Sequence, residues 1–233
     1  MSGVTYAGGM PRVTAAYRER QTDRILQAAE ECFARSGFQA TSMDEVIAAA
    51  GMSSSTVYRY FPEGKRSLIR AVLTRRMGPL VERIKRIAES EEPLDFERDF
   101  IEALTLLNYQ RHGALADSGA DQQDDALEGP GDVGLSSWAP LAYHAWGELT
   151  RDPETGVLVQ ESYRDIHSGL TRLCRNGQRA GTISDRLRPE QLASLIQSVS
   201  FGLIVEQLIT GRADVEGAAA TLRQLLAPEG SRS

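Results

Sequence analysis

Seven hydrogen-bonding side chains are concentrated in eight consecutive positions, 53–60. Proteins contact the phosphates of nucleic acids with hydroxyl groups, with the free amides of a helix N-terminus and with basic side chains. An arginine can also bind guanine in the major groove. Any one of these residues alone fits a solvated surface, whereas the group together indicates contact with a polyanion. The seven are Ser53, Ser54, Ser55, Thr56, Tyr58, Arg59 and Tyr60.

Two short predicted helices position this cluster. Ser42 and Glu45 have the spacing of a capping box, so a helix should begin there and run over 43–50. Gly51 can adopt the positive φ of a tight turn, and a second helix, capped by Ser53 or Ser54, should follow to about residue 60. Two helices joined by a tight turn that contains glycine form the helix-turn-helix arrangement of DNA-binding proteins.

The charge distribution agrees with a nucleic-acid-binding N-terminal part. The chain of 233 residues has a net charge of −6, which by itself argues against binding to a polyanion. However, residues 12–76 carry a net charge of +4 and the remainder −10. Chance asymmetry is the alternative explanation, but a basic module joined to an acidic body fits the predicted helix-turn-helix.

Four sequence segments occur around the predicted helix-turn-helix in a fixed order and spacing: FARSGF at 33–38, ATSM at 40–43, IAAAGMS at 47–53 and TVYRYFP at 56–62. On these segments, residues 18–71 resemble the TetR family of transcriptional regulators. The resemblance implies an all-α fold with an N-terminal three-helix helix-turn-helix domain and a larger C-terminal helical domain for ligand binding and dimerisation. It also implies a repressor that a small-molecule ligand releases from its operator.

The resemblance further implies which residues contact double-stranded DNA. Thr41 and Ser42 would meet phosphate at the start of the second helix, and the recognition helix would contribute Ser53, Ser54, Thr56, Tyr58 and Arg59. Of the paired tyrosines, we expect Tyr58 to face phosphate and Tyr60 to help packing. Lys65 opens the next helix and could hold the flanking DNA backbone.

Two features depart from the family pattern. Residues 62–66 form a turn one residue longer than usual, with Arg66 where an acid is common. Ser55 stands where many relatives have Gly or Pro, so no base preference is transferred to this chain.

The periodicity of apolar residues predicts helices along the rest of the chain. We expect a disordered arm over 1–15, the DNA-binding domain over 16–63 and the ligand-binding and dimerisation domain over 64–228. A long helix over 65–89 should be kinked or divided at Gly78 and Pro79. Further helices are predicted over 93–111, 138–150, 154–180, 189–210 and 215–226. Residues 113–137, rich in Gly, Asp and Gln, predict a mobile insert or long loop.

Aromatic residues with a few polar tips mark a candidate ligand pocket in the middle helices. Core packing is the alternative for each of them, because aromatic side chains contribute much of any core. The candidates are Phe100, Leu104, Tyr109, Trp138, Tyr143, Trp146, Tyr163 and His167.

The segment 189–210 is apolar on more than one face, which favours contact with both its own core and a second subunit. A fully buried helix of a monomer is the alternative. The candidate dimer-interface residues are Leu192, Leu195, Val199, Leu203, Leu222 and Leu225. A two-fold dimer would reach the half-sites of a pseudo-palindromic operator about one DNA turn apart, ~34–36 Å.

Other classes of protein fit the sequence less well. We find no phosphate-binding glycine loop, nucleophile motif or paired carboxylates, so an enzyme is not expected. Three histidines without metal spacing predict no metal site, and no cofactor is expected. Cys32 and Cys174 should be buried thiols. The chain shows no secretory signal and no run of about 18 apolar residues, so we expect a cytoplasmic protein without a membrane partner. A helical adaptor that does not bind DNA leaves the hydroxyl-rich short helix beside a basic first helix unexplained. An activator or a ligand-independent nucleoid factor with the same DNA-binding domain stays as an alternative.

Overall fold

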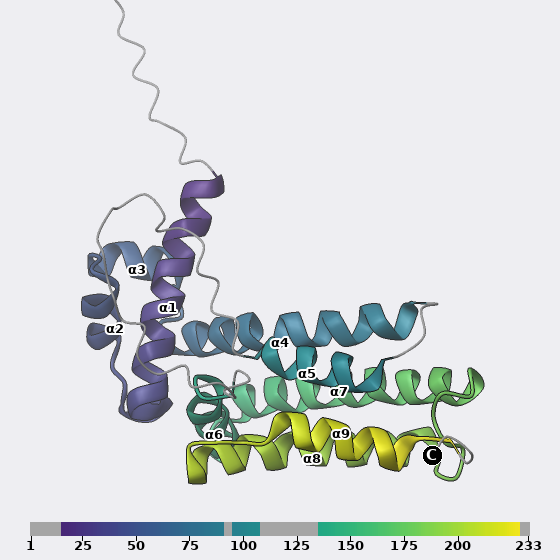
Figure 1. The fold of residues 1–233 in the computed structure, drawn as a ribbon. Helices are drawn as coiled ribbons and strands as arrows, with labels where there is room; N and C mark the ends of the chain where they lie inside the picture. The colour runs from purple at the N-terminus through teal and green to yellow at the C-terminus, as the bar shows by residue number, and fades with distance from the viewer. Residues whose placement is uncertain (1–14, 91–94, 108–134, 229–233) are drawn as a thin grey trace, which may run out of the picture.

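The computed structural model describes residues 15–90, 95–107 and 135–228, and every regular element in these ranges is a helix. The predicted all-α fold is therefore confirmed. In Figure 1, α1 to α3 gather at one end of an elongated body made by the remaining helices. The elements are α1 (Ala15–Ala40), α2 (Met43–Ala50), α3 (Ser54–Tyr60), α4 (Lys65–Glu89), α5 (Phe96–Thr105), α6 (Trp138–Glu148), α7 (Pro153–Arg179), α8 (Pro189–Thr210) and α9 (Val215–Leu226).

Local capping explains where the helices of the head, α1 to α3, begin and end. The predicted capping box is present, because the Glu45 amide donates to Ser42 Oγ at 3.2 Å and the Ser42 amide donates to Glu45 Oε2 at 2.6 Å. Gly51 ends α2 in the left-handed conformation at φ 61°, which a side chain would disfavour. Gly37 leaves helical geometry at φ 80° near the end of α1, and one further turn reaches Ala40.

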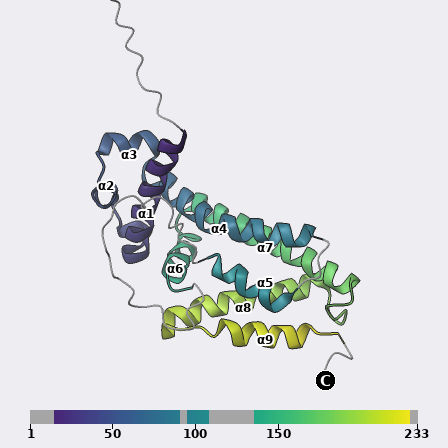
Figure 2. The same ribbon diagram turned by 45° about the horizontal axis from the view of Figure 1, so that its top comes forward.

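The head packs around a small apolar core that α4 enters from the body. Phe33 and Phe38 lie edge to face with ring centroids 5.1 Å apart. Val57 of α3 and Leu68 of α4 are fully buried beside them. Because α4 packs against α1 as well as against the body, it forms a continuous connection between the two parts. Figure 2 shows α4 leaving the head and running along the body beside α7.

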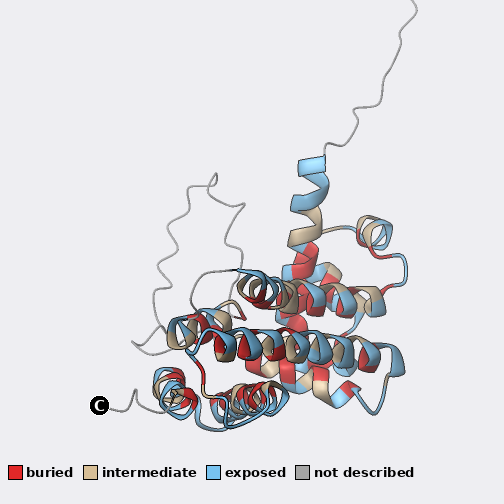
Figure 3. Ribbon diagram, turned by 90° about the vertical axis from the view of Figure 1, so that its right-hand side faces the viewer, coloured by how far each residue is buried: buried red, intermediate tan, exposed pale blue. Residues whose placement is uncertain are grey.

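In the body, α4 packs against α7, α7 against α8, and α5 against α9. Helix α4 runs undivided from Lys65 to Glu89 with Pro79 inside it, so of the predicted kink or division the division does not occur. Helix α5 begins later than predicted, because the side chain of Asp95 accepts from the Arg98 amide and caps it. Figure 3 shows the buried residues of these helices mainly on their inner sides and the exposed residues mainly on their outer sides.

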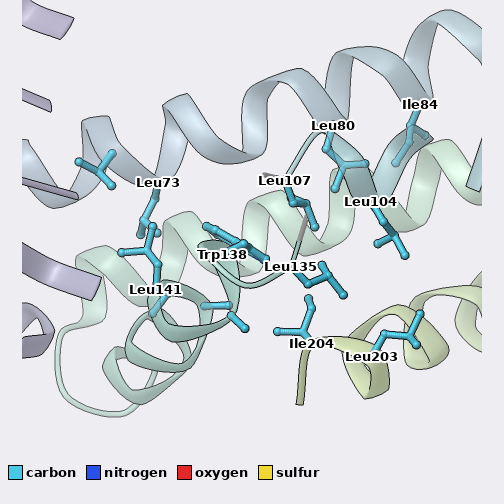
Figure 4. Packing of buried hydrophobic residues seen from close by; sticks show 14 of the residues in the cluster. Leu73, Leu80, Ile84, Leu104, Leu107, Leu135, Trp138, Leu141, Leu203 and Ile204 are labelled. Atoms are coloured by element: carbon cyan, nitrogen blue, oxygen red, sulfur yellow. The ribbon is translucent and has the colours of Figure 1, made fainter. Parts of the chain in front are cut away.

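Of the predicted mobile insert over 113–137, only residues 135–137 lie within the described ranges. Residues 113–134 lie outside the described ranges, as do 1–14. Leu135, however, is 1% exposed and packs with Leu107 and Trp138 in the core of the body, where Figure 4 shows it. The chain is therefore ordered by core packing from Leu135 onward.

By length and composition, α8 could cross a membrane, and it is the one helix of the described residues that meets this test. From the sequence we expected no membrane-spanning segment, because we found no run of about 18 apolar residues. The helix instead packs against α6, α7 and α9, and its residues Leu192, Ile196, Leu203 and Ile204 are buried there. This is the packing of a core helix in a globular body.

Candidate DNA-binding surface and ligand cavity

The N-terminus of α3 carries a cluster of hydroxyl groups. Ser53 caps the helix, since its Oγ accepts from the Thr56 amide at 3.3 Å. The same Oγ lies 3.1 Å from Ser55 Oγ and 2.9 Å from Thr56 Oγ1. These hydroxyls are exposed or half-buried, so their remaining hydrogen-bonding capacity faces solvent.

Buried Val57 fixes the orientation of α3 and leaves its outer face free. Ser54, Tyr58 and Arg59 are exposed, with Tyr58 at 42%. Tyr60 is half-buried against the core of the head, and the Arg59 guanidinium lies 5.6 Å from the centre of its ring. An outward Tyr58 and an inward Tyr60 are the orientations that the sequence led us to expect.

The structure contradicts the predicted phosphate contact of Thr41. Its side chain is 1% exposed, and its hydroxyl donates to the carbonyls of Gly37 at 2.8 Å and Cys32 at 3.1 Å. The turn after Gly37 directs Thr41 into the head, where it holds the end of α1. Its neighbour Ser42 is exposed at the N-terminus of α2, although its hydroxyl is used in the capping box.

Lys65 also has a different role from the one predicted. Its Nζ donates to the carbonyls of Gln39 and Thr41, both at 3.1 Å, so it binds the end of α1 to the start of α4. The longer turn before it is accommodated by Gly64, which has φ 63° and whose amide donates to the Phe61 carbonyl at 3.0 Å. A residue with a Cβ would be strained in this conformation.

A cavity of about 800 Å³ lies inside the body between α4, α5, α6, α7 and α8. Five of the predicted pocket residues line it: Phe100, Leu104, Trp138, Trp146 and Tyr163. Tyr143 does not, because it is 61% exposed on the other face of α6. His167 lies behind Tyr163 and outside the lining, and Tyr109 is outside the described residues.

The sequence reasoning missed the walls that α4 and α8 contribute. Leu73, Met77, Leu80 and Ile84 of α4 line the cavity, and Figure 4 shows three of these pointing toward side chains of α5, α6 and α8. Their i, i+3, i+4 spacing indicated a buried face, but nothing in that pattern distinguishes a cavity wall from a closed core. The lining of α8 includes Ile196, Gln197, Phe201 and Ile204.

Aromatic rings form one side of the cavity. Tyr163 and Phe201 are stacked with centroids 5.8 Å apart and an interplanar angle of 4°. Trp146 meets Phe201 edge-on at 5.4 Å, and His167 stacks on the other side of Tyr163 at 6.3 Å. Because the lining residues Tyr163, Gly202 and Val205 are exposed, the cavity opens to the surface between α7 and α8.

The polar groups of the cavity wall are few. Asp99 is buried and paired with Arg83 at 3.0 Å and Arg98 at 3.4 Å. The negative charge of Asp99 raises the pKa of Arg98 above its usual value. Burial raises the pKa of the Cys174 thiol to about 12, so this thiol is protonated at neutral pH. Both cysteines are free and buried, as predicted.

Two of the polar contacts between the head and the cavity-bearing body involve buried charged side chains. Arg76 of α4 forms a buried ion pair with Glu30 of α1 and donates to the Leu107 carbonyl at 2.9 Å. At the other end of α1, Gln39 Nε2 donates to Oε2 of the buried Glu148 at 2.8 Å. Glu148 ends α6, the helix whose two tryptophans line the cavity.

The outer face of α8 carries exposed residues at helical spacing, which we call the α8 stripe: Leu195, Ser198, Gly202, Val205 and Ile209. Ile209 is 77% exposed. Three predicted interface residues, Leu192, Leu203 and Leu222, are instead buried inside their own subunit, which contradicts their assignment. Leu195 and Leu225 are exposed and Val199 is half-buried, so these three can still contact a partner.

Comparisons with known proteins agree with this architecture. Residues 25–72 match the family model of bacterial regulatory proteins of the tetR family, and residues 130–229 match that of the BetI-type transcriptional repressor C-terminal domain. The chain is 22% identical over 186 residues to the transcriptional regulator UidR of Escherichia coli, covering 78% of this chain and 79% of UidR. It is 24% identical over 218 residues to the regulator YfiR of Bacillus subtilis, covering 93% and 95%.

Three of the solved structures with the same fold illustrate the match. Salmonella enterica GusR has a TM-score of 0.61 at 24% identity and covers 91% of this chain and 95% of its own. SmeT in complex with triclosan has a TM-score of 0.67 at 17% identity, covering 91% and 93%. A Saccharomonospora viridis regulator in complex with choline has a TM-score of 0.63 at 20% identity, covering 89% and 95%.

UidR and YfiR are both regulators of transcription rather than enzymes. Together with the helix-turn-helix geometry of α2 and α3, this makes the chain a DNA-binding transcriptional regulator. It belongs to the TetR family.

Proposed function

We propose that the chain is a dimeric repressor that a small molecule, bound in the cavity of the body, releases from a pseudo-palindromic operator. Residues 16–63 form its DNA-binding domain and residues 64–228 its ligand-binding and dimerisation domain, and it acts in the cytoplasm, where its DNA is. The match to a repressor-type C-terminal domain and the ligands bound in two structural neighbours, choline and triclosan, support this assignment.

DNA recognition is assigned to the exposed side of α3. Ser54, Ser55, Tyr58 and Arg59 are free to contact DNA, with the hydroxyls and phenol suited to phosphate and the guanidinium to phosphate or guanine. Ser42 at the start of α2 adds an exposed helix N-terminus. Thr41 and Lys65 leave this surface, because both are used to hold the head together.

Dimerisation is assigned to the α8 stripe with Leu225 of α9. Exposed apolar residues aligned along a helix are unusual for a monomer and mark a surface for association. The small residues Ser198 and Gly202 at the middle of the stripe allow two α8 helices to approach closely. A two-fold axis beside α8 would place the two heads on one side of the dimer.

The observation that carries the release mechanism is that α4 and α6 each touch both the cavity and α1. Leu73 of α4 and Trp146 of α6 line the cavity, whereas Arg76 and Glu148 on the same helices hold Glu30 and Gln39 of the head. A ligand that fits one arrangement of α4 and α6 better than another therefore shifts the position of the head. Only such a difference in affinity can move the equilibrium.

The test begins with selection of bound duplexes from a random DNA pool. Fluorescence anisotropy of the selected duplex with the full chain then measures affinity, and a library of small molecules is screened for release. Failure to enrich any duplex would overturn DNA recognition. Compounds that bind the protein but leave operator affinity unchanged throughout the screen would overturn the release mechanism.

Two substitutions test the assigned surface. Arg59→Ala and Tyr58→Phe should each weaken operator binding while thermal unfolding stays unchanged, since both side chains are exposed. Loss of a phosphate contact should also lower the salt slope of binding by about one unit. Arg212→Ala, at an exposed arginine between α8 and α9, is the matched control. Full operator affinity in the double variant of Tyr58 and Arg59 would refute the assignment.

A further inference from the structure

One buried polar atom on the cavity wall, Oε1 of Gln197, has no hydrogen-bond partner among the described residues. Gln197 lies on α8 and is 3% exposed. Its Nε2 donates to the backbone carbonyl of Tyr163 at 3.2 Å. Because a carbonyl can only accept, the amide nitrogen must face Tyr163 and the amide oxygen must face away from it. The side chain therefore presents an acceptor in a fixed direction.

An unmet buried acceptor destabilises a protein unless a bound group supplies a hydrogen. The neighbouring polar group on the same helix does not supply one, because Ser200 Oγ already donates to the Ile196 carbonyl at 3.0 Å. Gln197 is thus a polar group placed in a largely apolar wall, which is the usual way in which a pocket orients its ligand.

The charges around the cavity are already neutralised. The carboxylate of Asp99 has two arginines as partners, and Arg83 also contacts Glu102. The thiol of Cys174 is protonated at neutral pH, as described above. The other lining residue that is charged at neutral pH, Arg164, is exposed at the surface. A charged ligand would lose its hydration without gaining a buried counter-ion, which is strongly unfavourable.

The aromatic residues of the cavity wall favour ligands that contain flat rings. Trp138, Trp146 and Phe201 line the cavity, and the Tyr163–Phe201 stack lies beside Gln197. Flat rings pack on such surfaces in offset or edge-on arrangements. With a volume of about 800 Å³, the cavity accommodates a molecule of several rings.

We propose that the cavity binds an uncharged, largely apolar molecule with a ring system, oriented by a hydroxyl or N–H group that donates to Oε1 of Gln197. This inference rests on the proposed function in taking the same cavity as the ligand site. It adds the chemical class of the ligand and the residue that selects it.

A displacement assay on the full-length protein tests the inference. The neutral fluorescent amine N-phenyl-1-naphthylamine serves as the reporter, and its displacement is compared for 2-naphthol, 2-methoxynaphthalene and 2-naphthoate. These three share one ring system and differ in having a hydrogen-bond donor, no donor and a negative charge. We expect 2-naphthol to displace the reporter at about ten-fold lower concentration than 2-methoxynaphthalene, because only the donor satisfies Gln197. The carboxylate should be the weakest of the three.

The variant Gln197→Met keeps the length of the side chain and removes the acceptor. In this variant 2-naphthol and 2-methoxynaphthalene should displace the reporter equally well. Gln224→Met, at an exposed position of α9 away from the cavity, should retain the preference of the wild type. If circular dichroism shows that the methionine variant does not fold, Gln197→Asn withdraws the amide by one methylene and serves the same comparison.

Equal displacement by 2-naphthol and 2-methoxynaphthalene in the wild type, tightest binding of 2-naphthoate, or a preference that survives Gln197→Met would each overturn the inference. Parallel anisotropy measurements with operator DNA separate this failure from failure of the proposed function. If the reporter releases the operator but 2-naphthol and 2-methoxynaphthalene displace it equally well, the ligand class alone is overturned. A reporter that does not bind the wild type overturns both.

Discussion

The buried ion pair between Arg76 of α4 and Glu30 of α1 should show strong coupling in a double-mutant cycle. The two side chains are 3% and 10% exposed. Arg76 also donates to the Leu107 carbonyl at 2.9 Å and to Ser137 Oγ at 3.2 Å. Burial lowers the pKa of Arg76 most strongly, and the charge of Glu30 opposes this. Each charge therefore depends on the other to compensate its lost hydration.

The size of the effect follows from this burial. Arg76→Met leaves Glu30 without a counter-ion and should lower the free energy of unfolding by about 3–5 kcal/mol. Glu30→Leu should cost somewhat less, because Arg76 keeps two neutral acceptors. The double variant contains neither charge and should unfold with a free energy close to that of the wild type, since apolar residues often replace a buried pair without loss. The coupling free energy should therefore exceed about 2 kcal/mol.

Urea unfolding at one fixed protein concentration measures all four proteins, since association would otherwise change the apparent stability. The exposed pair of Arg172 and Glu89, 3.3 Å apart with side chains 47% and 65% exposed, is the matched control. Its cycle should give about 0–1 kcal/mol. Additive effects of Arg76→Met and Glu30→Leu, within about 0.5 kcal/mol, would refute the reasoning that the two charges compensate each other.

Three further predictions concern the head and the dimer. Gly202→Trp on the α8 stripe should shift the protein to monomers in light scattering and weaken operator binding, whereas Gly147→Trp, at an exposed glycine of α6, should do neither. Thr41→Val should lower the free energy of unfolding by about 1–3 kcal/mol, because it removes a buried hydroxyl with two acceptors, while the salt slope of DNA binding stays unchanged. The amide and hydroxyl of Ser42 lower the pKa of Glu45 below 4.5. This contribution to stability is complete above pH 4.5 and is lost as the pH falls through the lowered pKa. Ser42→Ala should therefore make the melting temperature depend less on pH in the acid range. The pKa of Glu45, followed by NMR, should move back toward 4.5.

The head could be predicted from the sequence because its signals are local. The capping pair of Ser42 and Glu45 and the left-handed turn at Gly51 each act within a few residues, so their spacing alone places α2 and α3. The hydrogen-bond partners of Thr41 and Lys65 were not predictable from local spacing. They depend on where the chain turns after Gly37 and on which carbonyls of α1 then come within reach of an ammonium group.

For the body, the sequence predicted the helices but not which side of each helix is buried, lines the cavity or faces solvent. Leu192 and Leu195 are equally apolar, yet one is buried in its own subunit and the other exposed, because α8 contacts several helices at once. In the same way, Trp146 lines the cavity while Tyr143, three residues earlier, faces solvent. A helix with apolar residues on several sides has no single periodicity from which to assign each side to core, cavity or partner.

The geometry of α8 constrains how a ligand could act. Gly202 and Val205 belong to the α8 stripe and also line the cavity, so a partner on the stripe would lie beside the ligand. Moving a two-state equilibrium from 1:99 to 99:1 requires a difference in binding free energy of about 5.5 kcal/mol. A ligand that buries about 250 Å² of apolar surface gains roughly 6 kcal/mol in all. Nearly all of its contacts must therefore exist in one state alone, which requires that the cavity be largely closed when the protein holds its operator.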